Sequence, residues 1–149
     1  MTSTLERILH VQSPTHTEFT IDLEPAIHFD RHTTLAVYIS LLEFSCFNSL
    51  LSEEPDKNIV TPNIFVNCSL SNSTTSFNGK PSNVLENITV DASTVIKHVN
   101  YNPIRLNVSS STIGTVLSHI TFWITNDNNN KIELRTPWRA KLLLEIIEE

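Results

Sequence analysis

The candidates for catalysis or metal binding in this sequence are six histidines, two cysteines and three acidic residues between positions 22 and 30. Imidazole and thiolate groups bind zinc, but the two cysteines lack the Cys-x-x-Cys spacing, and His28 and His32 are the one pair of histidines with the His-x-x-x-His spacing. His28 and His32 are four residues apart, which would align them only on a helix, and Pro25 and Asp30 argue against a helix there. The spacing therefore predicts neither a metal site nor a cofactor.

Acids and serines do not form a recognisable catalytic set either. Asp22, Glu24 and Asp30 could bring two carboxylates together for general acid–base catalysis, but acids near strand ends are commonly solvated. The serine run at 109–111 lacks the Gly-x-Ser-x-Gly elbow that exposes a nucleophilic serine. We therefore expect a protein that is not an enzyme, and an enzyme with a sandwich fold is the least favoured alternative.

The composition argues against several kinds of partner. The net charge is -6 and the ten basic residues are scattered, so we expect no direct contact with nucleic acid. Two glycines are too few for a Gly-rich phosphate loop. No signal peptide precedes the first strand and no apolar stretch approaches the roughly 20 residues of a membrane span, so we expect synthesis in the cytoplasm and no membrane insertion. Cys46 and Cys68 are expected to be reduced, with a disulfide as the alternative.

The elements that would position any site are strands, because apolar and polar residues alternate through most of the chain. In the last third, Ile120, Phe122 and Ile124 fall on one face of a strand, and Thr121, Trp123 and Thr125 fall on the other. Asparagines at 126–130 then favour a tight hairpin turn, after which residues 131–134 resume the alternation and residues 141–147 form a buried strand. We expect Phe122 inside the core and Trp138 covering the bottom of it.

Residues 35–44 form the strongest single segment. The alternation predicts a central strand covered on both sides; a helix is the alternative. One face is expected to carry Leu35, Val37, Ile39 and Leu41, and the other Ala36, Tyr38, Leu42 and Phe44. Polar runs at 48–58 and 71–82 are expected to be long loops. About nine or ten short strands without a linker indicate one all-β domain, an antiparallel β-sandwich of two sheets packed face to face.

The candidate interface residues lie at the start of the chain and on the last hairpin. Residues 1–17 read as an arm or edge segment ahead of the sandwich domain at 18–149. This arm carries four apolar residues that a neighbouring subunit could cover, namely Leu5, Ile8, Leu9 and Val11. Trp123 is the fifth candidate, with packing at the edge of the core as its alternative role.

The order of these segments resembles a family of virion structural proteins from Polinton/Maverick-type elements and related adintoviruses and virophages. The similarity spans residues 19–147 and rests on strand-and-turn blocks at 21–29, 35–50, 64–70, 78–85, 101–108, 120–134 and 142–146. The resemblance implies a jelly-roll-like sandwich and a virion protein of the minor-capsid, penton or spike type.

The expected function is therefore that of a non-enzymatic viral structural protein located in the virion. We expect it to self-associate, with a trimer or pentamer as possible homo-oligomers, and to contact other capsid proteins or a further partner. The alternative from another class is a monomeric carbohydrate- or peptide-binding β-sandwich that uses Trp123, Tyr101 or Tyr38 as a stacking platform.

Overall fold

The computed structural model describes residues 2–13, 18–47, 63–70, 75–77, 80–89, 95–103, 105–108, 114–126, 129–131 and 137–149. These residues form strands and no helix. In chain order the strands are β1 (Ser3–Gln12), β2 (Glu18–His28), β3 (Thr34–Phe47), β4 (Asn63–Cys68), β5 (Thr75–Phe77), β6 (Lys80–Ser82), β7 (Val84–Thr89), β8 (Val95–Val99), β9 (Leu106–Asn107), β10 (Val116–Thr125) and β11 (Arg139–Glu148).

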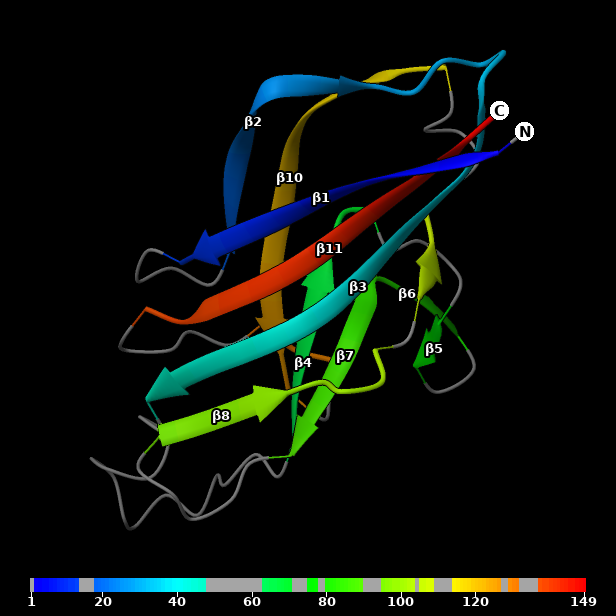
Figure 1. Cartoon of the computed structure of the whole chain (residues 1–149). Helices are drawn as coiled ribbons and strands as arrows, with labels where there is room; N and C mark the ends of the chain where they lie inside the picture. Colours follow the sequence, from blue (N-terminus) through cyan, green and yellow to red (C-terminus); the bar gives the residue numbers. More distant parts are fainter. Residues whose placement is uncertain are drawn as a thin grey trace, which may run out of the picture.

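Two antiparallel sheets pack face to face, as expected for a β-sandwich (Figure 1). The front sheet has the order β1-β11-β3-β8, and β9 also pairs with β3. The rear sheet has the order β2-β10-β4-β7, and β5 and β6 form a small separate hairpin. The apolar inner faces of the two sheets form one continuous core.

The connectivity is that of a jelly roll. When the short strands β5, β6 and β9 are left aside, the first described strand pairs with the last, β1 with β11, and the second with the one before it, β2 with β10. The third and sixth also pair, β3 with β8, and the two in the middle pair with each other, β4 with β7. This folding of one long hairpin around itself defines the double-sheet jelly roll, so the predicted fold class is confirmed.

The strand β3 is central in the front sheet, but its pattern changes phase at a bulge. Leu142 pairs with Leu41 and Lys141 pairs with Glu43, which leaves Leu42 as an extra residue without a partner in the register. The bulge turns Phe44 to the same face as Leu41, so both are buried in the core. The prediction that they lie on opposite faces is wrong, as is the prediction of cover on both sides, because Tyr38 and Leu42 remain partly exposed on the outer face.

The strand β10 has the faces that its alternation predicts. Ile120, Phe122 and Ile124 are buried, whereas Thr121 and Trp123 are partly exposed. Trp138 is buried as expected and packs against three phenylalanine rings at centroid distances of 5.3, 5.4 and 6.5 Å, those of Phe19, Phe44 and Phe122. This aromatic cluster closes one end of the core.

The expected hairpin after β10 lies only partly within the described residues. Both sides of β10 are occupied by β2 and β4, and the described residues after it contribute one isolated bridge, between Thr125 and Lys131. Asn129 adopts the left-handed backbone expected of the asparagine-rich turn, with φ of 61°. Residues 132–136 and the acidic loop predicted at 48–58 lie outside the described residues, whereas the polar run at 71–82 contains the hairpin of β5 and β6 instead of only a loop.

The N-terminal segment is a strand of the front sheet, so the prediction of an arm outside the sandwich is wrong for residues 3–12. The strand β1 pairs with β11 over its whole length, from Ser3 opposite Glu148 to Gln12 opposite Arg139. Leu9 and Val11 belong to the core, with 7% and 3% of their surface exposed. Their period-two spacing matches that of the buried residues of β11, and the edge position is the alternative that the sequence left open.

Candidate functional site

Two surface features of the front sheet are candidates for function: the free edge of β1 and a hollow on the outer face. The apolar residues predicted as an interface divide between the core and this edge. Leu9 and Val11 are buried within the chain, whereas Leu5 and Ile8 are 52% and 50% exposed. Among these four residues the interface prediction therefore stays open for Leu5 and Ile8, and it also stays open for Trp123, which is partly exposed.

The backbone N–H and C=O groups of β1 form hydrogen bonds on one side of the strand, the side that faces β11. Ser13 continues the register of β1 opposite Trp138, and its N–H donates to the Trp138 carbonyl at 2.9 Å. Hydrogen-bonded pairs alternate in an antiparallel ladder, so odd-numbered residues of β1 direct their backbone groups toward β11. The even-numbered residues, including Ile8, direct theirs away from the sheet, where no described strand pairs with them (Figure 1).

A groove of about 490 Å³ lies between β1 and β2, the edge strands of the front and rear sheets. Arg7 crosses it: its guanidinium donates hydrogen bonds to the carbonyls of Pro25 at 2.8 Å and Glu24 at 3.2 Å. Apart from these contacts, the groove is lined by successive residues of the two strands, 7–12 and 21–24. One arginine thus links the two sheets along this side of the sandwich.

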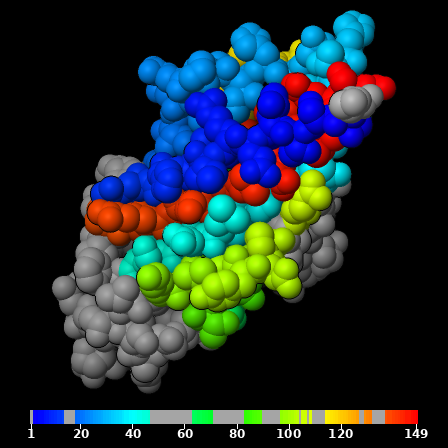
Figure 2. All heavy atoms as spheres, viewed as in Figure 1, coloured from blue at the N-terminus to red at the C-terminus, as the bar shows by residue number. Residues whose placement is uncertain are grey.

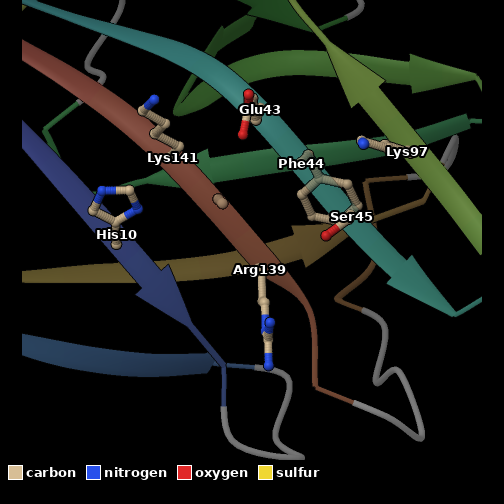
Figure 3. Close-up of a pocket in the computed structure, with 8 residues that line it drawn as sticks. His10, Glu43, Phe44, Ser45, Lys97, Arg139 and Lys141 are labelled. Carbon is tan, nitrogen blue, oxygen red and sulfur yellow. The ribbon is translucent and has the colours of Figure 1, made fainter.

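The outer face of the front sheet, which Figure 2 shows, carries a shallow hollow of about 190 Å³. Cross-strand register places its side chains in two neighbouring rows, His10–Lys141–Glu43 and Arg139–Ser45–Lys97. In Figure 3 these side chains project from four adjacent strands, β1, β11, β3 and β8. The hollow brings together residues that lie far apart in the sequence.

The hollow carries positive charge that the described residues do not neutralise. Lys97, Arg139 and Lys141 form no ion pair within the described part of the chain, although Glu43 lies in the same hollow. Two cations elsewhere form ion pairs: Arg105 lies 3.0 Å from Glu145, and Lys131 contacts Glu18. A concave site with more cations than carboxylates favours anions over cations, so an anion is the class of ligand that suits this hollow.

The aromatic residues predicted as a stacking platform do not come together. Tyr38 lies on the outer face of the front sheet, where the Arg105 guanidinium covers its ring at 4.2 Å. Trp123 belongs to the rear sheet, on the opposite side of the sandwich, and the Lys131 ammonium lies 5.6 Å from its ring centroid. Tyr101 is almost fully exposed beyond β8. Each could contact a ligand alone, but the three share no surface.

Chemistry based on cysteine, histidine or paired carboxylates finds no support among the described residues. No group of three or more His, Cys, Asp or Glu side chains there could hold a metal ion. Asp30 is used locally, since its carboxylate accepts a hydrogen bond from the backbone N–H of His32 at 2.8 Å. Cys46 and Cys68 are buried and not joined by a disulfide, as predicted, and burial raises the pKa of Cys46 to about 12, which keeps it protonated and unreactive. The serines at 109–111 lie outside the described residues.

The hollow cannot be recognised from the sequence, because its residues come from four strands that become neighbours only through the strand order. The only local signal is the alternation Arg139-Ala140-Lys141, which places two cations on the face opposite a core residue.

The described residues contain no helix long and apolar enough to span a membrane. No family model matches this chain, and no curated protein does either.

Proposed function

We propose that this chain is a non-enzymatic structural protein of a virion that self-associates and contacts other capsid proteins. The strand order supports the proposal, because the double-sheet jelly roll is a common architecture of capsid proteins. The same architecture also serves lectins and cupins, so the fold alone does not decide the function. The resemblance of residues 19–147 to virion proteins of the minor-capsid, penton or spike type favours the structural role.

The observation that carries self-association is the exposed apolar edge of β1. Leu5 and Ile8 are among the most exposed large apolar side chains of the described residues, and both lie on a strand whose backbone is free along one side. Exposed apolar groups beside unpaired N–H and C=O groups favour pairing with another chain. A protein that assembles uses such an edge, whereas a monomer must protect it.

Light scattering coupled to size-exclusion chromatography, over a wide range of micromolar concentrations, tests this proposal. We expect a mass that is a defined multiple of 16.9 kDa, and electron microscopy of the same fractions should show particles of one size. A single-chain mass at every concentration would contradict self-association.

The anion-binding hollow favours one second candidate, a module that binds an anionic oligosaccharide. Titration of a sulfated oligosaccharide into the protein tests it, with Arg139→Ala/Lys141→Ala as the deficient variant. Lys131→Ala is the control, because Lys131 is paired with Glu18 and lies outside the hollow. A strict monomer whose binding is lost only in the double variant would place this candidate ahead of the structural role.

A further inference from the structure

We propose that two copies of this chain pair edge to edge through β1, antiparallel, with Ile8 of each copy opposite Ile8 of the other on a two-fold axis. The inference rests on the self-association proposed above and names the surface and the partner, a second copy. It joins the front sheets of the two copies into one continuous sheet.

The backbone of β1 fits this pairing. The even-numbered residues present their N–H and C=O groups to the free edge, as shown by the hydrogen bond from Ser13 to Trp138 on the opposite side. Ile8 opposite Ile8 makes every hydrogen-bonded pair across the new interface even-numbered. A two-fold axis normal to the sheet also keeps the inner faces of both copies inward, so Leu9 and Val11 stay in their cores.

The side chains select this register over its neighbours. With Ile8 on the axis, Glu6 lies opposite His10 of the second copy, and the imidazole N–H can donate to the carboxylate. When the second strand slides by two residues in one direction, which keeps even-numbered residues paired, Arg7 lies opposite Arg7. A slide by four residues in that direction places Glu6 opposite Glu6. Like charges repel in both registers. A shift in the other direction separates Glu6 from His10 and shortens the ladder.

The hollow on the front sheet adds charge complementarity. His10 belongs to the cross-strand row His10–Lys141–Glu43, and the proposed register extends that row with Glu6 of the second copy. A carboxylate thereby arrives beside cations that have no ion pair within the described residues. On the axis, the two Ile8 side chains cover each other, and each is 50% exposed in the single chain.

The strand β1 has neither the proline nor the bulge that often protects an edge, although it carries the charged residues Glu6 and Arg7, and the Arg7 guanidinium is held by carbonyls of β2. Its ten pairs with β11 run without a register shift, and its sequence contains neither proline nor lysine. Natural sheets prevent edge pairing with such residues or with bulges. A regular edge of this length, without a proline or a bulge, can accept a further strand.

Cysteine substitutions test the register directly. In a hydrogen-bonded antiparallel pair the Cα atoms are about 5.5 Å apart, within the range that a disulfide spans. Ile8→Cys should therefore form a covalent dimer under mild oxidation at least about tenfold faster than Glu6→Cys or His10→Cys, whose equivalent positions lie about 13 Å apart. The double variant Glu6→Cys/His10→Cys should cross-link again. The native cysteines do not interfere, because both are buried.

A charged side chain at position 8, on the proposed two-fold axis, tests the interface without cross-linking. Ile8→Lys brings two ammonium groups together, so we expect the mass to fall by a factor of two or more in light scattering. Val116→Lys is the matched control, since Val116 is 53% exposed and lies in the rear sheet; it should keep the wild-type mass. Circular dichroism of both variants shows that the fold persists.

The possible outcomes separate this inference from the proposed function. Fast cross-linking at Ile8 together with dissociation by Ile8→Lys alone supports the β1 pair. An oligomer whose mass Ile8→Lys leaves unchanged, or which cross-links faster at Glu6 or His10, overturns the pair while self-association stands. A single-chain mass for the wild type at every concentration, without cross-linking at Ile8, overturns both.

Discussion

The strands β1 and β2 are both edge strands on the same side of the sandwich, yet only β2 is interrupted by a proline and a register shift. The strand β2 contains Pro25, and its pairing with β10 shifts register between Leu117 and His119. Arg7 occupies two of its carbonyls. The strand β1 pairs regularly along its length and has no such feature. Proline and bulges at an edge oppose the addition of another strand, so the difference indicates which edge is available to a partner.

The two edges do not differ in how they build the core. Each strand buries residues on its inner face, Leu9 and Val11 in β1 and Leu23 and Ile27 in β2. Phe19 at the start of β2 stacks on Phe122 with ring centroids 5.7 Å apart. The comparison therefore separates two properties, contribution to the core and protection of the backbone, which substitutions can test one at a time.

The largest effect on stability is expected at Phe122 of β10, which lies opposite Phe19 of β2 in the rear sheet. Phe122→Ala removes a fully buried ring that packs on Phe19 and Trp138, and should lower the free energy of unfolding by about 3–5 kcal/mol. Thr121→Ala is the control: it loses a hydrogen bond of 2.8 Å to the Thr20 hydroxyl, worth about 1 kcal/mol at a partly exposed site. Equal losses in urea melts would show that the faces of β10 are reversed.

A matched pair of leucines tests whether β1 is as integral as β2. Leu9 and Leu23 are 7% and 6% exposed, so Leu9→Ala and Leu23→Ala should each cost about 2–4 kcal/mol in the same denaturant titration. Ile8→Ala, on the outer face of β1, should cost less than about 1 kcal/mol. If Leu9→Ala were as mild as Ile8→Ala, β1 would be a detachable arm, as the sequence first suggested.

The sequence was sufficient for strands and their inner faces wherever alternation runs unbroken, because side chains of a strand alternate with a period of two. Residues 120–124 follow that rule. It was insufficient at Leu42, since a bulge depends on the register with a strand about a hundred residues later. For the same reason the hollow could not be found: His10, Glu43 and Lys97 become neighbours only through strand order.

Removal of the Arg7 side chain, which links the edge strands β1 and β2, is expected to have a smaller effect on stability. Arg7→Ala removes both hydrogen bonds to the carbonyls of β2, and because these bonds are exposed to solvent we expect a loss of about 1 kcal/mol. Arg7→Lys keeps the charge but lacks the planar group that reaches two acceptors, so it should recover only part of that loss. Thermal melts of the three proteins measure this, and full recovery by lysine would show that charge alone matters.

The smallest effect is expected at Ser40, in the outer-face row that runs Ile8–Leu143–Ser40 across three strands. Ser40 is 1% exposed, and its hydroxyl makes no hydrogen bond within the described residues. Because an unpaired hydroxyl costs free energy when it is removed from water, Ser40→Ala should leave the free energy of unfolding unchanged or raise it by up to about 1 kcal/mol. Ser40→Ala should also leave the mass in solution unchanged, because Leu143 separates Ser40 from Ile8 and the free edge. A loss above 1 kcal/mol in urea melts would mean that the Ser40 hydroxyl has a partner, and a change of mass would mean that the surface used for assembly extends from the edge of β1 onto the face of the front sheet.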